Sequence, residues 1–197
     1  MKRYICIFSI LALFLSINIA CNKNQEKVKD DTKDLNGWYI GGGKEDGYEI
    51  GAATDKYNGG PVYYLRSNNI TKEKFGTIIK NFNPSEYYGK RIKLSGYIKS
   101  DKVYGWAGIW LRIDGGAGDG PYGKTLAFDN MQNRPIKETT EWKKYEIVTD
   151  VPKESKMLFY GALLHGSGEI GISDLKFEVV GNETAITTWI PQPDYPQ

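Results

Sequence analysis

The stretch GWAGIWLRIDG, residues 105–115, carries the side chains best suited to hold a ligand. Successive side chains of a β-strand point to opposite faces, so one face of this stretch is apolar and suits a core. That face carries Ala107, Ile109, Leu111 and Ile113. The opposite face carries Trp106, Trp110, Arg112 and Asp114. Two indoles, a guanidinium and a carboxylate on one surface are unfavourable unless they are covered or used, which predicts a binding face.

A sugar has polar edges and apolar C–H faces, so its site needs an aromatic platform surrounded by hydrogen-bonding groups. We expect Trp106 and Trp110 to form such a platform. The expected polar rim consists of Arg66, Arg112, Asp114, Asp129 and Asn130. Two arginines beside indoles favour an acidic sugar, because guanidinium pairs bidentately with carboxylate or sulfate. In the alternative, both tryptophans fill a second apolar layer under a loop, and Arg112 pairs with Asp114 or Glu49.

Catalytic and metal motifs give little support for an enzyme. GDGPYG, residues 118–123, matches G-x-G-x-x-G but precedes no helix, which predicts a hairpin loop. His165, the only histidine, is expected in a loop at a strand end, and one histidine without paired cysteines excludes an ordinary zinc site. The sequence has no G-x-S-x-G elbow. A pair of carboxylates for glycoside hydrolysis stays open, because their separation in space decides it.

The elements that must position these residues are short β-rich runs between clusters of Gly, Asn, Asp and Pro. This pattern predicts an all-β, antiparallel two-sheet sandwich. The expected strands lie near 38–40, 47–53, 61–67, 75–82, 90–100, 104–114, 124–129, 142–149, 156–164 and 169–180.

Alternation within these runs predicts the core. MLFYGALL, residues 157–164, is apolar on both faces and is expected to be a central strand. In IGISDLKFEVV, Ile170 and Ile172 share one parity, while Leu175, Phe177 and Val179 share the other. A β-bulge at Ser173–Asp174 would keep both sets facing the core. The predicted core includes Ile92, Leu94, Ile109, Leu111, Leu163, Leu175 and Phe177.

The N-terminus predicts export. Lys2 and Arg3 precede an apolar run that ends in Ala20-Cys21, as in a secretory signal followed by a lipidated cysteine. We expect a signal peptide over 1–20, lipidated Cys21 with a polar tether over 21–36, a domain over 37–180 and a proline-containing tail over 181–197. Simple secretion and an uncleaved membrane anchor are the alternatives. Each of these possibilities leaves the domain outside the cytoplasm.

Charge and cysteine content exclude several classes of protein. The chain has 26 Lys and Arg against 24 Asp and Glu, and removal of Lys2 and Arg3 with the signal leaves 24 of each. A balanced domain lacks the basic stripe of a nucleic-acid binder. Both cysteines, Cys6 and Cys21, precede the domain, so a disulfide within the domain is impossible.

Three stretches resemble carbohydrate-binding modules of the family four, nine and twenty-two type, which are galactose-binding-like jelly rolls. They are YYGKRIKLSGYIKSD (87–101), EWKKYEIVTDVP (141–152) and GEIGISDLKFEVV (168–180). The resemblance implies a jelly roll whose concave sheet face binds the ligand. It also implies that Trp142 is a framework residue of the core and that Asp174 helps to hold a structural calcium ion. Similar domains also serve as sensory or accessory parts of bacterial regulators.

Together these features lead to a hypothesis of a non-catalytic carbohydrate-binding lipoprotein of the bacterial cell envelope. Its expected partners are a polysaccharide or oligosaccharide and the membrane that holds its lipid anchor. One alternative is a small glycan-active lyase or hydrolase, although the Gln-Ile-His and Tyr-Phe-Lys motifs of jelly-roll lyases are missing. Another is an adaptor that binds a protein through the tryptophan face. Fold alone does not decide between them.

Overall fold

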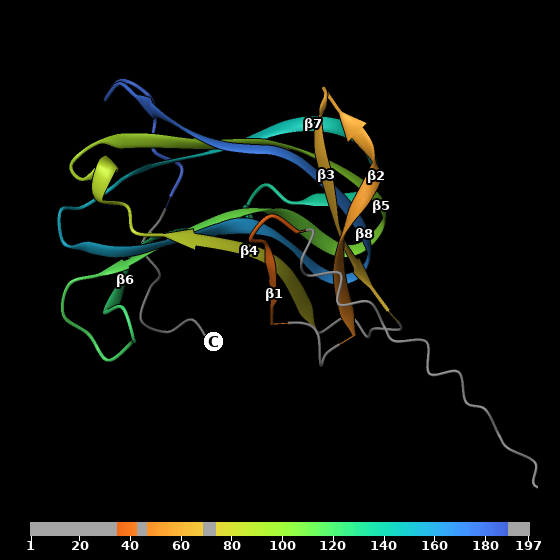
Figure 1. The fold of residues 1–197 in the computed structure, drawn as a ribbon, viewed down its shortest axis with the longest axis horizontal. Coiled ribbons are helices and arrows are strands. Elements are labelled where there is room, and N and C mark those ends of the chain that lie inside the picture. The colour runs from red at the N-terminus through yellow and green to blue at the C-terminus, as the bar shows by residue number, and fades with distance from the viewer. Residues whose placement is uncertain (1–34, 43–46, 69–73, 189–197) are drawn as a thin grey trace, which may run out of the picture.

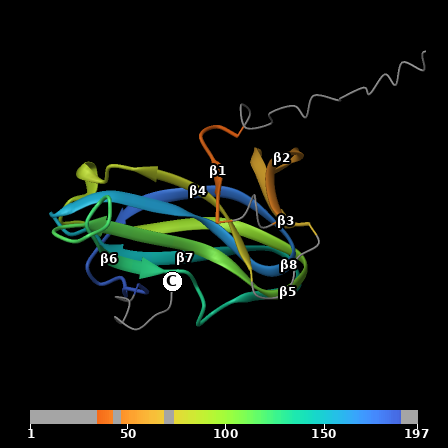
Figure 2. The same ribbon diagram turned by 90° about the horizontal axis from the view of Figure 1, so that it is seen from below.

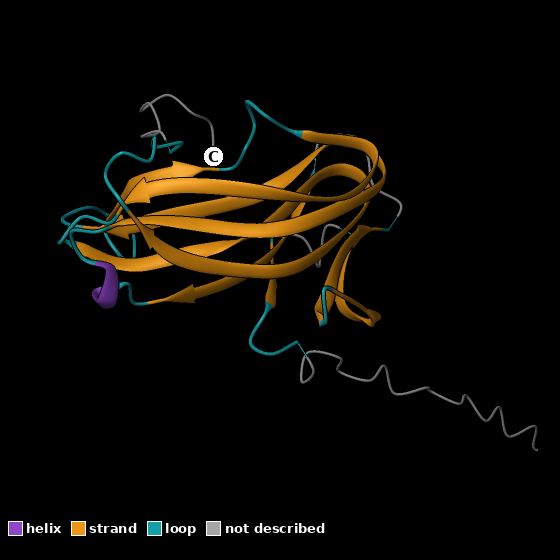
Figure 3. Cartoon of the chain, turned by 90° about the horizontal axis from the view of Figure 1, so that it is seen from above, coloured by secondary structure: helices purple, strands orange, loops and turns teal. Residues whose placement is uncertain are grey.

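The computed structural model describes residues 35–42, 47–68 and 74–188, and this part of the chain is built almost entirely of antiparallel strands (Figure 3). The strands are β1 (Tyr39–Gly41), β2 (Tyr48–Tyr57), β3 (Gly60–Ser67), β4 (Phe75–Phe82), β5 (Arg91–Gly115), β6 (Lys124–Asp129), β7 (Ile136–Asp150) and β8 (Ser155–Val180), with one short 3-10 helix, η2 (Ser85–Tyr87). The predicted all-β, antiparallel two-sheet jelly roll is confirmed. No helix within the described ranges is long and apolar enough to cross a membrane.

Two long strands, β5 and β8, pair with each other along their whole length and pass through both layers of the sandwich (Figures 1 and 2). Their pairing runs from Arg91 opposite Val180 to Gly115 opposite Ser155. The first half of β5 and the second half of β8 form one layer with β7, β3 and β2. The other halves form the second layer with β6, β4 and β1. We call these layers the β7 sheet and the β6 sheet.

The turn from one sheet to the other depends on glycine. Gly105 of β5 lies opposite Gly166 of β8 where both strands bend. Both residues have positive φ angles, +117° and +81°, which other L-residues rarely adopt. A Cβ atom at either position would also clash with the carbonyl oxygen of the facing strand. Glycine therefore allows the paired strands to curl without separating.

The inward-facing parity of β5 changes just before this bend, near Lys102, whose φ angle is +49°. Ile92, Leu94 and Ile98 are fully buried before it. After it, the buried residues of the inner face are Ala107, Ile109, Leu111 and Ile113. The predicted inner face of residues 105–115 is therefore confirmed. MLFYGALL is also central as predicted, because this part of β8 lies between β4 and β5.

The predicted β-bulge is present in β8. Ser173 pairs with Tyr97 and Lys176 pairs with Ser95, so Asp174 and Leu175 together oppose the single residue Gly96. Asp174 has a φ angle of +53°, in the left-handed region.

The bulge keeps Ile172 fully buried while Leu175 and Phe177 pack against the core half-buried. Val179 is 54% exposed, contrary to its predicted core position. The reason is that β3 pairs with β8 only as far as Ser173, so the end of β8 lacks that neighbour.

One predicted core residue faces the wrong way. Leu163 is buried but pairs with Thr77 and Gly108 on the outer face of the β6 sheet, and its neighbour Leu164 fills the core. Because both faces of β8 are covered here, apolar content alone does not distinguish them.

The edges of the domain differ slightly from the expected ones. Leu35 is buried in the core, so the packed domain includes residues before the expected start at 37. The first part of the tail lies along β7, where the backbone N–H of Thr187 donates to the Val148 carbonyl at 3.0 Å. The predicted signal peptide, Cys21, most of the tether and the end of the tail, with Trp189, lie outside the described residues.

The change Leu111→Ala tests the core assignment. Leu111 is fully buried on the inner face of the β6 sheet, so truncation should lower the free energy of unfolding by about 2–5 kcal/mol, as for other large-to-small core changes. Urea denaturation measures this loss. Val179→Ala, at an exposed apolar position, is the matched control and should change stability by less than about 0.5 kcal/mol. Equal effects of the two changes would contradict the assignment.

Candidate functional site

The outer face of the β6 sheet gathers aromatic side chains from five strands, and we call it the aromatic face. Cross-strand registers define its rows. One row is Phe75–His165–Trp106, the second is Tyr39–Ile79–Gly161–Trp110, and the third is Asn81–Phe159–Arg112–Phe128. Side chains directly opposite in neighbouring strands lie close enough to contact one another. The sheet thus brings Trp106, Trp110, Arg112 and Asp114 onto one surface.

Trp110 is a covered part of this face. Its side chain is only 8% exposed, and its indole N–H donates to Thr77 Oγ1 at 2.7 Å. The Thr77 hydroxyl in turn donates to the Ala162 carbonyl at 2.9 Å. This chain of buried bonds fixes the indole against β4 and β8. Trp110 therefore supports the face from below and offers little ring surface to a ligand.

Trp106 and His165 form a half-buried pair at the bend. Their rings stack with centroids 6.0 Å apart and an interplanar angle of 19°. The predicted loop position of His165 is wrong, because His165 lies inside β8 opposite Trp106. Its Nδ1 is buried and has no hydrogen-bond partner among the described residues. The two stacked rings lie at the end of the aromatic face that is next to the bend.

Arg112 is held in a defined orientation. Its guanidinium lies 4.8 Å from the ring centroid of Phe159, and Nη2 is 3.1 Å from Asp114 Oδ2. The Thr125 hydroxyl also donates to Asp114 at 3.1 Å. The predicted alternative pairing of Arg112 with Asp114 is thus present. The Arg112 side chain is nevertheless 42% exposed, although its Nε is buried and has no hydrogen-bond partner among the described residues.

Two aromatic rings that the sequence analysis did not select are the most exposed on this face. Tyr39 is 42% exposed and Phe75 is 50% exposed. The Tyr39 hydroxyl donates to Asn81 Oδ1 at 2.9 Å, which fixes the ring on β1. Burial and the nearby Tyr122 raise the pKa of Tyr39, while Arg112 lowers it. The signal in the sequence is weak, because β4 carries large side chains on both faces.

Two predicted rim residues, Asp129 and Arg66, are not on the aromatic face. Asp129 points inward and is fully buried, where it accepts bonds from both Arg134 nitrogens and from the Met131 amide. Arg66 lies on β3 in the β7 sheet and pairs with Glu49. Asn130 lies just beyond β6, where its Oδ1 accepts from the Gln132 amide at 3.1 Å and closes a turn. The predictions for Asp129 and Arg66 are wrong because residue type does not reveal inner face or sheet.

The expected core position of Trp142 is also wrong. Trp142 is half-buried on the outer face of the β7 sheet. Its ring stacks on Tyr57 at 4.4 Å, and the Lys99 ammonium lies 5.5 Å from its centroid. The ring packs against Gly171, whose missing side chain leaves room for it. Trp142 therefore belongs to a surface aromatic cluster on the far side of the sandwich.

The structural calcium ion predicted at Asp174 stays a prediction. Calcium takes six to eight oxygen ligands, which include backbone carbonyls as well as carboxylates. Asp174 Oδ2 instead accepts from Lys176 Nζ at 2.8 Å. Within the described ranges, no three carboxylate, histidine or cysteine side chains gather as a metal site. A short polar residue also suits the left-handed backbone conformation of this bulge.

Sequence comparison identifies one curated relative. No family model matches the chain. The chain is 35% identical over 168 residues to a protein described as an uncharacterized HTH-type transcriptional regulator, YbfP, of Bacillus subtilis (strain 168). The match covers 84% of this chain and 55% of the relative, so the chain spans about half the length of the curated relative that it matches.

Solved structures share the fold at low sequence identity. The CBM22-1 xylan-binding domain of Paenibacillus barcinonensis Xyn10C superposes with a TM-score of 0.50 at 16% identity, covering 73% of this chain and 86% of that domain. The C-terminal family 22 carbohydrate-binding module of Clostridium thermocellum Xyn10B gives 0.51 at 13%, covering 78% and 92%. The enzymatically active domain of tailspike protein 4 from bacteriophage CBA120 gives 0.55 at 14%, covering 74% and 20%. These likenesses establish the jelly-roll fold.

The bond between Trp110 and Thr77 yields a stability prediction. Thr77→Val removes the acceptor and leaves a buried indole N–H unpaired, so the free energy of unfolding should fall by about 1–3 kcal/mol. Chemical denaturation measures the loss. Thr77→Ser keeps the hydroxyl and should retain most of the stability. If Thr77→Val is as stable as the serine variant, the bond does not hold the face together.

Proposed function

We propose that this protein is a non-catalytic carbohydrate-binding protein and that the aromatic face of its jelly roll contacts the glycan. The observation that carries this proposal is that exposed rings and a fixed ion pair share one face of the sheet. Tyr39 and Phe75 expose ring surface, and Arg112 with Asp114 supplies donors and acceptors between the strands. Two of the similar solved structures are named as xylan-binding or carbohydrate-binding modules, which supports the same use of this fold.

The exposure of each side chain on the aromatic face decides which role we assign to it in binding. The rings of Phe75, Tyr39 and Trp106 would stack on the apolar C–H faces of sugar rings. The accessible Arg112 N–H groups and the Asn81 amide would bond sugar hydroxyls. Trp110 would fix β4 against β8 rather than stack on the ligand, because its ring is covered. Such a face needs little rearrangement on binding.

The charge of the aromatic face favours a neutral glycan. The hypothesis of an acidic polysaccharide rests on two arginines near an indole platform, but Arg66 is on the other sheet. Arg112 is the one arginine on the described strands of the face, and Asp114 balances it at 3.1 Å. A paired guanidinium and carboxylate bond hydroxyl groups well and give no net attraction for an anion.

Hydrolysis at this face has no support from its carboxylates. Glycosidases of the usual kind need two carboxyl groups that flank the scissile bond. On the strands of the aromatic face that the structure describes, Asp114 is the one outward-facing carboxylate, since Asp129 points inward. Asp114 is largely buried and ion-paired to Arg112. Binding is therefore the activity that this face supports best.

Ligand sensing is the second candidate function. The relative from Bacillus subtilis is named as a transcriptional regulator, and it shares 35% identity with 84% of this chain. Regulators respond to signals through a binding domain, and a jelly roll with an aromatic face would serve that purpose. If the protein is a ligand sensor, its ligand is a short soluble saccharide. If it is a glycan-binding protein, it also binds long polysaccharide chains. Comparing the affinity for monomers, oligomers and polymers of one sugar separates the two.

We further propose that the protein is exported and attached to the cell envelope through Cys21. The apolar run of residues 4–20 ends at Ala20-Cys21, and the following residues are polar and charged. A lipid on Cys21 would hold the jelly roll near the membrane, with residues 22–34 as spacer. Such attachment would bring glycans to the cell surface.

Binding measurements on two surface variants test the proposed face. Arg112→Ala and Phe75→Ala should each weaken binding of a neutral oligosaccharide roughly tenfold or more, which is about 1.4 kcal/mol, because each removes an exposed contact. Calorimetric titration of a panel that includes xylohexaose measures this, with thermal melts beside it. Trp142→Ala, on the opposite sheet, is the control and should bind like the wild type. Loss of binding in Trp142→Ala alone would move the site to the other face.

Cell fractionation tests the proposed attachment. Cys21→Ser removes the thiol that would be acylated, so the protein should leave the membrane fraction or accumulate with its signal uncut. Cys6→Ser, within the predicted signal, is the matched control and should leave processing unchanged. An unaltered mass and membrane fraction in Cys21→Ser would rule out the lipid anchor.

A further inference from the structure

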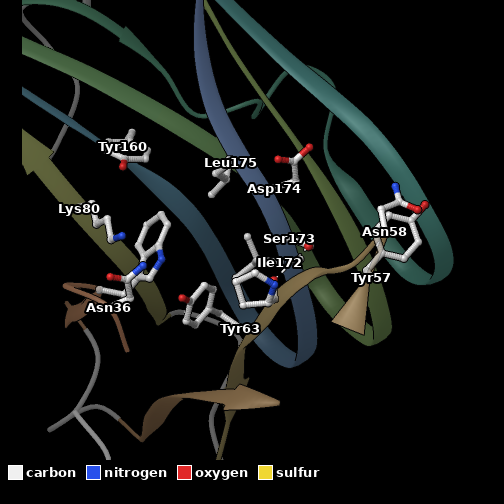
Figure 4. A pocket seen from close by; sticks show the side chains of 13 residues that line it. Asn36, Tyr57, Asn58, Tyr63, Lys80, Tyr160, Ile172, Ser173, Asp174 and Leu175 are labelled. Carbon is white, nitrogen blue, oxygen red and sulfur yellow. Dashed lines mark hydrogen bonds between the residues drawn. The ribbon is translucent and has the colours of Figure 1, made fainter. Parts of the chain in front are cut away.

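A pocket of about 270 Å³ opens at the edge of the sandwich, between the two sheets (Figure 4). The chain before β1, the tip of the β2–β3 hairpin, β4 and β8 border it. The residues that shape it are Trp38, Tyr57, Tyr63, Lys80, Tyr160 and Leu175.

The walls of this pocket are aromatic and firmly packed. Trp38 is 7% exposed, and its ring lies 5.9 Å from Tyr63 and 5.4 Å from Tyr160. Tyr160 also meets Phe177 edge-on at 4.9 Å, which ties the wall to the β7 sheet. Because these rings belong to the edge of the core, the pocket keeps its shape without a ligand. Rigid apolar walls of this kind suit one face of a small ring.

A lysine without an acidic partner enters this pocket. Lys80 Nζ lies 4.8 Å from the centroid of the Trp38 ring. Burial lowers the pKa of Lys80, and no nearby charge offsets that effect. Among the residues that the structure describes, no carboxylate pairs with Lys80. The one acid that lines the pocket, Asp174, is already paired with Lys176 at 2.8 Å.

Two hydroxyl groups complete the polar part of the pocket. Tyr63 and Tyr160 make no hydrogen bond through their hydroxyls to any described residue, and Figure 4 shows the Tyr160 hydroxyl directed towards Lys80. Burial raises the pKa of Tyr160, so its hydroxyl stays protonated and able to donate. The Lys80 ammonium and the Tyr160 hydroxyl thus lie on the same side of the pocket, and neither pairs with a carboxylate of the described residues. A carboxylate is the group that satisfies such a set of donors.

We propose that this edge pocket is a second ligand site, distinct from the aromatic face, that takes a single sugar-sized ring carrying a carboxylate. Its volume admits one ring rather than a chain. Trp38 and Tyr63 are largely covered, so they would border the ring with their exposed edges rather than stack on it, and the carboxylate would meet Lys80 and Tyr160. A uronic acid has this chemistry. The inference goes beyond glycan binding by the aromatic face and does not require it.

The full-length protein titrated with D-glucuronate and D-galacturonate, with D-glucose and D-galactose as neutral partners, tests the site. We expect binding of at least one uronate and at least tenfold weaker binding of the matching neutral sugar. Lys80→Met keeps the apolar stem over Trp38 and removes the charge, so it should weaken uronate binding at least tenfold. Lys80→Arg should retain most of the affinity. Tyr160→Phe, which removes one hydroxyl, should weaken binding severalfold and serves if Lys80→Met fails to fold.

Two further variants distinguish this site from the other surfaces. Lys137→Met removes an exposed cation elsewhere and should bind uronate like the wild type. Arg112→Ala should leave uronate binding unchanged while it weakens oligosaccharide binding to the aromatic face. The proposal is overturned if the wild type binds neither uronate, or if Lys80→Met binds as well as Lys80→Arg. If Arg112→Ala loses uronate binding and Lys80→Met keeps it, the uronate binds at the aromatic face and not in the edge pocket.

Discussion

The pairing of β5 with β8 along their whole length is the interaction on which the rest of the structure depends. The two strands bend together at Gly105 and Gly166. Because of this bend, one antiparallel pair of strands lies at the centre of both sheets. The remaining strands then add to its outer edges, β7 and β6 along β5, and β3 and β4 along β8. A side chain larger than glycine at the bend would separate this pair and with it the two layers.

This pair of strands also creates the aromatic face. Since the inward parity of β5 changes just before the bend, Trp106, Trp110 and Arg112 point outward from the β6 sheet while Ile109 and Leu111 fill the core. Covered and exposed aromatic groups then divide the work. The buried Trp110 is hydrogen-bonded to Thr77, whereas Tyr39 and Phe75 are exposed to solvent. The buried ring therefore contributes mainly to stability and the exposed rings to binding. Substitutions can test the two contributions separately.

Strand positions and local faces could be predicted from the sequence, because alternation is a property of a single strand. The inner face of residues 105–115, the central place of residues 157–164 and the bulge at Asp174 all follow from local pattern. The membership of a strand in one sheet or the other is not local. The sequence therefore does not show that Arg66 lies on the other sheet or that Trp142 lies on the surface of the β7 sheet.

The edge pocket could not be predicted at all from sequence, for the same reason. Trp38, Tyr63, Lys80 and Tyr160 come from four separate segments, and only the closed sandwich brings them together. Asp129 shows the converse, since a carboxylate that resembles a rim residue in sequence is a buried partner of Arg134 in the fold. Charge and aromatic content thus indicate that ligand sites exist, while sheet order decides where they are.

The most direct measurement of the central claim is a nuclear magnetic resonance titration of the isotope-labelled protein with a neutral oligosaccharide, following the tryptophan indole and arginine side-chain signals. If the aromatic face binds the glycan, the signals of Trp106 and Arg112 shift with saturation, and that of Trp142 on the far sheet stays in place. Shifts confined to Trp142, or none at any indole across a broad panel of neutral glycans, would contradict the account.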